Sequence, residues 1–169
     1  MADVLTRIDP VPSAALSLAG GSVTLTEAAK RYSLRGKAAD LQPFVPVKLP
    51  TKIGDVSDSG ENLVIMLGPD EWLLLGAVTG DSAGQAVSIT DITERQIGLT
   101  IEGPRAAELL MSGCPLDLER MVVGRGTRTI YETVEIVMIK HGDERYHVEV
   151  WRSFAPWLWV ALEAAGASA

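Results

Sequence analysis

The clearest pattern in the sequence is a pair of apolar runs on either side of a polar turn. The runs NLVIML and WLLLGAV are separated by Gly68-Pro69-Asp70-Glu71, and these residue types are typical of β-turns. The pattern predicts an antiparallel hairpin with a four-residue connection. Because polar residues are almost absent from both runs, we expect both strands to be buried.

Alternation of polar and apolar residues predicts further strands. Ile97, Leu99 and Ile101 alternate with other residues, as expected of a strand with one buried face. The sequence HGDE at 141–144 reads as a turn, so the segments on either side of it form a second predicted hairpin. The predicted strands outside the first hairpin are residues 31–35, 86–92, 97–101, 129–140 and 146–151.

Two helices are predicted from their start and stop signals. The first follows Gly103 and Pro104 and ends near Gly113. The second, residues 154–165, follows the candidate N-cap Ser153 and precedes Gly166. Together these elements predict an α+β fold, a mostly antiparallel sheet built from hairpins with two or more helices packed on it.

The segments outside this pattern set the expected domain organisation. Residues 1–30 are rich in Ala, Ser, Gly, Thr and Pro, and we expect an N-terminal arm that is loosely packed or bound to a partner. Prolines and glycines over residues 43–60 predict a long irregular crossing, since proline lacks the N–H donor that a central strand needs. Residues 31–169 are expected to form one domain.

The closing helix has an unusually apolar surface, with Glu163 as the single charge over residues 154–165. On a helical wheel the core stripe consists of Phe154, Leu158, Ala161, Leu162 and Ala165. A helix that is apolar almost all round is buried on more than one side. We therefore predict a partner interface formed by Trp157, Trp159, Val160 and Ala164. The alternative is that the N-terminal arm of the same chain covers this face.

Composition narrows the classes of partner and compartment. The 169 residues carry 15 Lys and Arg against 22 Asp and Glu, a net charge of −7, which disfavours nucleic acid. One cysteine excludes an internal disulfide and is typical of a cytoplasmic protein. No apolar run is long enough to span a bilayer, and the first residues lack the pattern of a secretory signal. We expect a cytoplasmic chain without a membrane partner.

No group of residues in the sequence has the spacing of a catalytic, cofactor or metal site. Cys114 has no histidine near it in sequence, and we interpret it as a small buried hydrophobe. His141 and His147 match no metal-binding spacing. The neighbouring carboxylates Asp70 and Glu71 are expected to be solvated charges of the turn. Asp91 interrupts an apolar region, and a capped turn explains it about as well as a functional role does.

Several segments together resemble the gamma subunit of heterotetrameric sarcosine oxidase. They cover most of the chain in the right order, and the combination of GPDEWLL, GPRAAELL before GCPLDL, and VWRSFAPWL is specific. The family also resembles the tetrahydrofolate-binding domain of the glycine-cleavage T-protein. The segments are RYSLRG at 31–36, LGPDEWLLL at 67–75, DITERQIGLTIEGPRAAELLMSGCPLDL at 91–118, TRTIYETVEIV at 127–137 and RYHVEVWRSFAPWLWVAL at 145–162.

This resemblance implies a non-catalytic structural subunit of an oxidoreductase. The enzyme oxidatively demethylates sarcosine to glycine, with H2O2 and either formaldehyde or 5,10-methylenetetrahydrofolate as products. The resemblance further implies that FAD, FMN, NAD, zinc and tetrahydrofolate belong to the other subunits. It makes the large alpha subunit the main partner within an alpha-beta-gamma-delta complex. A related N-methyl amino acid such as dimethylglycine is an alternative substrate.

One departure bears on the alternative function, a free-standing tetrahydrofolate-binding or one-carbon transfer protein of the T-protein class. The T-protein pattern G-x-x-G-[YF]-E-[IL] aligns with residues 142–148, where Arg145 replaces the second glycine and His147 replaces the glutamate. An imidazole cannot offer a pterin the paired acceptor oxygens of a carboxylate. In that alternative, Asp91 is the best candidate for acid-base work.

Overall fold

The computed structural model describes residues 8–27 and 29–167 and has two antiparallel sheets. The first sheet has the strand order β1-β2-β8-β11-β10-β9, and the second has the order β4-β5-β6-β3-β7. The strands of the first sheet are β1 (Leu16–Leu18), β2 (Gly21–Leu25), β8 (Gln96–Glu102), β9 (Gly126–Tyr131), β10 (Val134–Gly142) and β11 (Arg145–Trp151). Those of the second are β3 (Arg31–Arg35), β4 (Val56–Asp58), β5 (Leu63–Gly68), β6 (Glu71–Leu75) and β7 (Ser88–Asp91).

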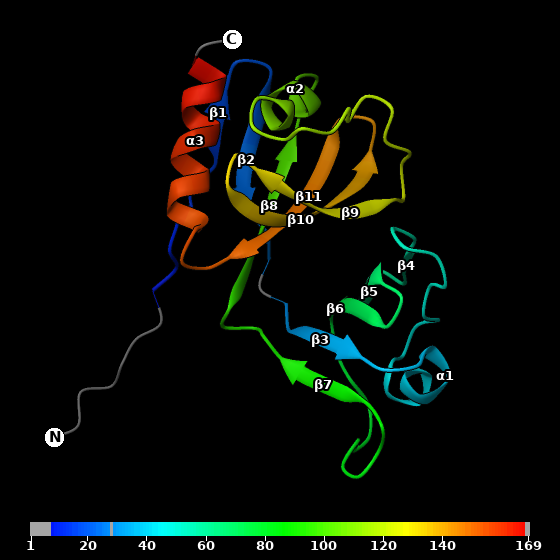
Figure 1. Ribbon diagram of the computed structural model, residues 1–169. Helices are drawn as coiled ribbons and strands as arrows, with labels where there is room; N and C mark the ends of the chain where they lie inside the picture. The colour runs from blue at the N-terminus through cyan, green and yellow to red at the C-terminus, as the bar shows by residue number, and fades with distance from the viewer. Residues whose placement is uncertain (1–7, 28, 168–169) are drawn as a thin grey trace, which may run out of the picture.

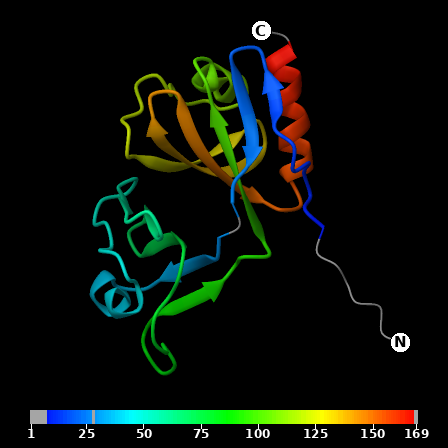
Figure 2. The same cartoon turned by 180° about the vertical axis from the view of Figure 1, so that it is seen from behind.

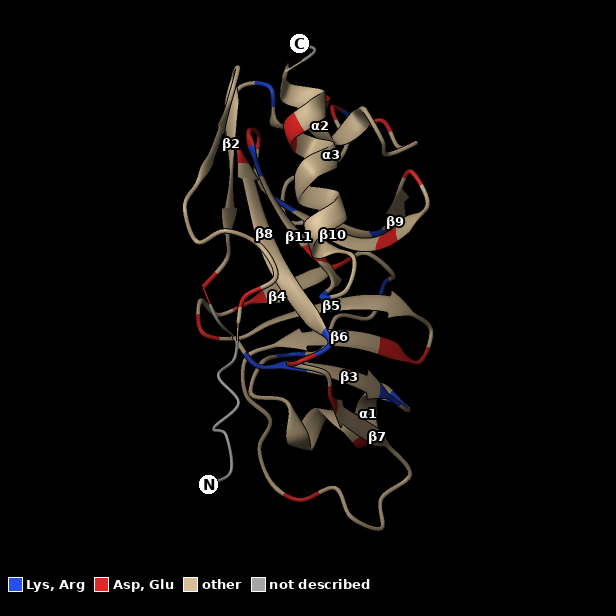
Figure 3. Cartoon of the chain, turned by 90° about the vertical axis from the view of Figure 1, so that its left-hand side faces the viewer, with Lys and Arg blue, Asp and Glu red and all other residues tan. Residues whose placement is uncertain are grey.

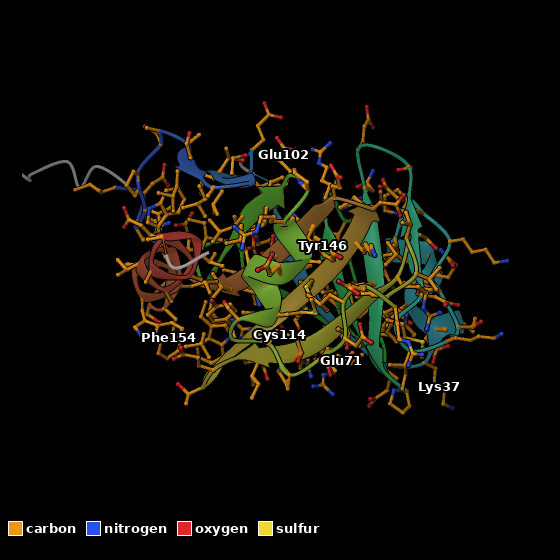
Figure 4. All side chains as sticks on the ribbon, turned by 90° about the horizontal axis from the view of Figure 1, so that it is seen from above. Lys37, Glu71, Glu102, Cys114, Tyr146 and Phe154 are labelled. Atoms are coloured by element: carbon orange, nitrogen blue, oxygen red, sulfur yellow. The ribbon has the colours of Figure 1, made fainter. Side chains whose placement is uncertain are left out.

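The two sheets lie face to face between outer layers of helix and irregular chain (Figure 1). Helices α2 (Ala106–Met111) and α3 (Ala155–Ala167) cover the first sheet. Helix α1 (Ala38–Leu41), the 3-10 helix η1 (Gln42–Phe44) and the irregular segment after it cover the second. Seen from above, Phe154 beside α3 and Lys37 before α1 mark opposite sides of the molecule (Figure 4). The predicted α+β class is confirmed.

The hairpin predicted from the two apolar runs is formed by β5 and β6, but its connection is two residues long, Pro69 and Asp70, and not the predicted four. Their register pairs Ile65 with Leu73 and Met66 with Trp72, and a bulge precedes the pair Gly68 and Glu71. Alternate residues of both strands face either the first sheet or the layer that contains α1. Both faces of this hairpin are buried, which explains why its sequence lacks polar alternation.

The prediction of a single strand over residues 129–140 is wrong, because the chain forms a hairpin there. Strands β9 and β10 pair with Tyr131 opposite Val134, so that Glu132 and Thr133 form a two-residue turn. Glu132 has a φ of 49°, in the left-handed region. Glycine or asparagine usually marks such a turn, and neither is present here, which hid the turn from the pattern.

The N-terminal arm expected over residues 1–30 is also different in the structure. Strand β2 pairs with β8 through Val23 opposite Ile101, and β1 pairs with β2 at the sheet edge. Val23 is fully buried, and Val11 is in the same core as α3. Figure 2 shows these two strands beside α3. Residues 16–25 are therefore part of the domain, and residues 1–7 lie outside the described part.

The two predicted helices are both present. Helix α2 follows the predicted glycine and proline, and α3 runs from Ala155 to Ala167. Leu158 and Leu162 are fully buried in the core of the first sheet, as the wheel predicts. No helix of the described residues is both long and apolar enough to cross a membrane.

A buried ion pair connects the two sheets. Arg31 of β3 donates from Nε to Oε2 of Glu149 on β11 over 2.6 Å, and these residues are 4% and 1% exposed. The other carboxylate oxygen, Oε1, lies 2.8 Å from Nε2 of His147, and Arg31 Nη1 donates to the carbonyl of Ala29. Both carboxylate oxygens are therefore occupied, as burial of a charge requires.

Gly98 makes the space for this network. It lies opposite Glu149 in the β8–β11 ladder. A Cβ atom at Gly98 would lie 2.8 Å from Glu149 Oε1 and 2.8 Å from His147 Cε1. Only a residue without a side chain fits this close approach.

Truncating Leu158 to Ala should lower the free energy of unfolding by about 2 to 5 kcal/mol, because it leaves a cavity in a closed core. Val160 lies two residues further along the same helix and is 60% exposed. Val160→Ala is the matched control and should stay within about 0.5 kcal/mol of wild type. Urea unfolding followed by circular dichroism measures both, and equal losses would contradict the assigned orientation of the helix.

Replacing Glu149 by Gln should destabilise the fold by about 3 to 5 kcal/mol at pH 7, since it leaves Arg31 buried without its counter-charge. Burial alone would raise the pKa of Glu149, but His147 and Arg31 outweigh it and lower this pKa below its ordinary value of 4.5. The stabilisation is therefore complete above pH 4.5 and declines as the pH falls below that value.

The deficit of Glu149→Gln relative to wild type should accordingly shrink between pH 5 and pH 3 in urea titrations. Glu119 is exposed and provides the control, because Glu119→Gln should change stability little at either pH. A deficit that is the same at both pH values would show that the carboxylate charge does not stabilise the fold.

Candidate functional site

The two sheets leave a cavity of about 470 Å³ on one side of the Arg31–Glu149 pair. Thr26, Thr100 and His147 form its inner wall, and His141 and Arg145 are at the first-sheet side of its lining. Thr26 Oγ1 lies 3.0 Å from Thr100 Oγ1 and 3.4 Å from His147 Nδ1. A chain of hydrogen bonds therefore leads from this cavity to the buried carboxylate.

The two histidines of the sequence meet at this cavity, although neither has a sequence motif. The rings of His141 and His147 are 6.2 Å apart and nearly perpendicular. Partial burial lowers the pKa of His141, and the nearby His147 and Arg145 act in the same direction, whereas Asp58 opposes them. His141 and the hydrogen-bonded His147 thus make this wall polar, and the charged residues Asp58, Glu61 and Arg145 line the same cavity.

The cavity bears directly on the T-protein alternative, because His147 occupies the position of the pterin-binding glutamate. Its Nε2 atom is engaged with Glu149, the nearest carboxylate on the same face of β11. That carboxylate is in turn held by Arg31. Neither residue can therefore present a free pair of acceptor oxygens to a pterin at this wall.

The other residues singled out in the sequence do not come together. Cys114 is buried in the core of the first sheet, with Sγ 3.8 Å from Thr129 Oγ1. Asp91 is exposed at the end of β7 and accepts the backbone N–H of Thr93, the capped turn that its sequence allowed. Asp70 is exposed at the hairpin turn. Among the described residues, no group of three or more His, Cys, Asp or Glu side chains could hold a metal ion.

Glu71 differs from its neighbour Asp70 and from the solvated charge expected of it. It receives a two-point hydrogen bond from Arg128 of β9 and lies 3.1 Å from Nη2 of Arg35 on β3. The hydrogen bond from Arg128 is the main cause of its lowered pKa, with burial opposing and the charge of Arg35 assisting. Glu71 thus forms a second ionic link between the sheets, near their edge.

The outer face of α3 exposes three of the four residues that the sequence predicts to bind a partner. Val160 is 60% and Trp157 38% exposed, and Ala164 is exposed as well. Figure 3 shows α3 in the colour of uncharged residues over almost its whole length. The side chains of Trp157 and Val160 are therefore exposed on this face of the helix.

Trp159 is the exception among the predicted interface residues, because it is only 6% exposed and lies in the core of the first sheet. The N-terminal strands explain this difference. A Cβ atom on Gly166 would lie 2.8 Å from Leu18, so β1 packs closely against the last turn of α3. The chain therefore covers one flank of the helix itself and leaves the Trp157 and Val160 face open.

Two exposed aromatic residues, Trp151 and Phe154, extend the exposed face of α3. The helical wheel did not predict either of them on this face. Phe154 precedes α3 and is 45% exposed, in contrast to its predicted place in the core stripe. Trp151 is 41% exposed and its ring centroid lies 6.4 Å from that of Phe154. We call Trp151, Phe154, Trp157 and Val160 the aromatic surface. In the sequence, Trp151 follows His147 and Glu149 at every second position, so the pattern places all three on the same face of β11. This signal could have linked Trp151 to the polar face of the strand.

Comparison with known proteins gives consistent matches. Residues 35–168 match the model of the sarcosine oxidase gamma subunit family. The sarcosine oxidase gamma subunit of Corynebacterium sp. strain U-96 is 28% identical over 145 residues, which are 75% of this chain and 71% of that protein. The gamma subunit from an Arthrobacter species is 26% identical over 111 residues, which are 59% of this chain and 55% of that protein.

Solved structures share the fold. A chain of heterotetrameric sarcosine oxidase from Corynebacterium sp. U-96 superposes with a TM-score of 0.80 at 24% identity, covering 89% of this chain and 87% of that one. Aminomethyltransferase T of the glycine cleavage system from Bartonella henselae gives a TM-score of 0.63 at 14% identity, covering 86% of this chain and 46% of that one. The likeness to aminomethyltransferase T is one of fold, and the family match over residues 35–168 shows that the chain belongs to the sarcosine oxidase gamma subunit family.

Proposed function

We propose that this chain is a non-catalytic structural subunit of a heterotetrameric sarcosine oxidase and that it binds the large alpha subunit through the aromatic surface. Its membership of the gamma subunit family is the observation that carries this proposal. The exposed aromatic surface supports it, since Trp and other aromatic residues are enriched where protein interfaces bind most strongly.

The proposed complex oxidatively demethylates sarcosine to glycine and releases H2O2. Its one-carbon product is formaldehyde or 5,10-methylenetetrahydrofolate. In this proposal FAD, FMN, NAD, zinc and tetrahydrofolate are bound by the other subunits, and the gamma subunit contributes binding surface to a cytoplasmic complex. The wall formed by His147 and Glu149 supports the assignment of folate to another subunit, because its carboxylate is already engaged.

The observation behind the alternative, a free-standing folate-binding protein, is the fold shared with aminomethyltransferase T. A shared fold does not carry the site, because function depends on the residues placed on it. Asp91 would be the acid-base residue of this alternative, yet it is exposed and is not among the residues that line the cavity beside His147.

The purified chain should be colourless and should give no calorimetric signal when it is titrated with tetrahydrofolate at micromolar concentration. The physical reason is the missing acceptor pair at His147. Absorbance from 350 to 500 nm tests for flavin in the same sample. A stoichiometric flavin spectrum, or a micromolar dissociation constant for tetrahydrofolate, would favour the alternative.

Val160→Asp should split the complex while leaving the subunit folded. Association would have to remove the new carboxylate from water without a partner charge, at a cost of several kcal/mol. In the free subunit an exposed valine becomes an exposed carboxylate, and the melting temperature should change by no more than about 2 °C, because such surface changes amount to about ±0.5 kcal/mol.

Co-purification with a tagged alpha subunit and a thermal melt of the free subunit measure the two effects. Val122 is 67% exposed on the loop before β9 and provides the control, because Val122→Asp adds the same charge away from α3. Unimpaired co-purification of Val160→Asp would place the interface elsewhere, and an unfolded variant would show that the chain itself covers this face.

A further inference from the structure

A second cavity lies at the opposite end of the space between the sheets. It has a volume of about 270 Å³, and residues of both sheets line it. Trp151 belongs both to its lining and to the aromatic surface, so the cavity is continuous with the surface that we assign to a partner. Neither the T-protein alignment nor the proposed function uses this cavity.

Charged side chains of both signs surround this cavity. Arg35, Arg95 and Arg128 line it together with Glu71 and Glu135. Glu71 is held between Arg128 and Arg35, and Glu135 lies 3.9 Å from Arg128. Arg35 also lies 3.7 Å from Asp70 of the hairpin turn. Arg35 and Arg128 are thus both engaged by carboxylates, whereas Arg95 takes part in no ion pair among the described residues.

Arg95 is positioned at the rim of the cavity, beside the aromatic surface. Its guanidinium carbon lies 5.2 Å from the centre of the Trp151 ring. No ion pair joins it to a carboxylate in the described part of the chain. Its backbone carbonyl accepts the N–H of Arg152 at 2.7 Å, which fixes the residue beside the end of β11. A planar guanidinium held in this way favours two-point binding of a carboxylate.

Gln96 supplies an unused polar group to the same cavity. The residue is 7% exposed, and its Oε1 atom is buried without a hydrogen-bond partner within the described residues. Buried side-chain amides are nearly always hydrogen-bonded. A half-turn about the terminal torsion exchanges the oxygen for the NH2 group, so the amide can donate to an acceptor that enters the cavity.

A carboxylate matches what this cavity offers. One of its oxygens can accept from the Arg95 guanidinium and the other from the Gln96 amide. Gln96 also lines a neighbouring cavity, but that cavity contains the carboxylates Asp9 and Glu27, which repel an anion. Since the chain as a whole has a net charge of −7, the attraction for a carboxylate is local to the Arg95 end.

We propose that this cavity receives the carboxylate of an Asp or Glu side chain of the partner subunit, which Arg95 and Gln96 bind next to the aromatic surface. The inference rests on the proposed function, because it needs a partner on that surface. The interface is otherwise apolar, and this electrostatic contact would determine how the two subunits are aligned.

Arg95→Glu tests the proposal in the complex, co-expressed with the other subunits and captured through a tagged alpha subunit. The affinity of the alpha subunit for the variant should fall by about 30-fold or more, as expected when a partly desolvated charge pair is replaced by repulsion. Arg95→Gln is the second variant, with the charge removed and the shape approximately kept. It should also weaken association, and its residual binding should depend less on salt than that of wild type.

Arg145→Glu is the matched control. Arg145 is the first residue of β11, at the end of that strand away from Trp151, and its Nε atom is 3.8 Å from Glu102 Oε2. This reversal should change the affinity by less than about twofold. An Asp→Lys or Glu→Lys change at the contacting position of the alpha subunit should restore binding of Arg95→Glu, which a folding defect could not do.

The outcomes separate this inference from the proposed function. If Val160→Asp splits the complex while both Arg95 variants bind like wild type, the interface stands and the carboxylate contact is wrong. If all three variants bind normally, both proposals are wrong. Titration of the purified chain with acetate and succinate tests for a free carboxylate ligand. Saturable binding of either acid with a millimolar or lower dissociation constant, abolished by Arg95→Glu, would contradict the proposal. The ligand of the cavity would then be a small carboxylic acid and not a side chain of the partner.

Discussion

The packing of the two sheets depends on the buried ion pair of Arg31 and Glu149. A carboxylate with 1% exposure is stable only when its oxygens are occupied and a cation is close. The pair joins β3 of one sheet to β11 of the other, so the two layers are fixed in register as well as packed. Gly98 is required opposite Glu149 because a Cβ atom there would displace the carboxylate.

The two cavities between the sheets differ in chemical character. Apolar residues fill the centre of the interface, and polar residues gather on either side of it. Near His147 the polar groups bind one another, and the buried Glu149 carboxylate is engaged by His147 and Arg31. Near Arg95 and Gln96 the polar groups are left in excess. A fold shared with aminomethyltransferase T thus carries its own arrangement of donors and acceptors here, and function depends on the residues placed on a fold.

Helix α3 combines a buried face with an exposed apolar face. Leu158 and Leu162 close the core of the first sheet, and β1 covers the flank that contains Trp159 and Gly166. The remaining face, with Trp157 and Val160, continues through Phe154 to Trp151. An apolar surface of this kind is unusual on a protein without partners, and it connects directly to the cavity that contains Arg95.

The sequence by itself determined the local elements, because short-range patterns encode them. The β5–β6 hairpin, the two principal helices, the α+β class and the family all followed from runs of residues adjacent in the chain. The β9–β10 turn was missed because Glu132 adopts a left-handed conformation without the usual glycine. Only the tertiary structure decided which apolar flank of α3 the N-terminal strands cover, and only it paired Arg31 with Glu149, 118 residues apart. Such contacts depend on how sheets stack, and the period of a single strand specifies which residues share a face without specifying which distant face they meet.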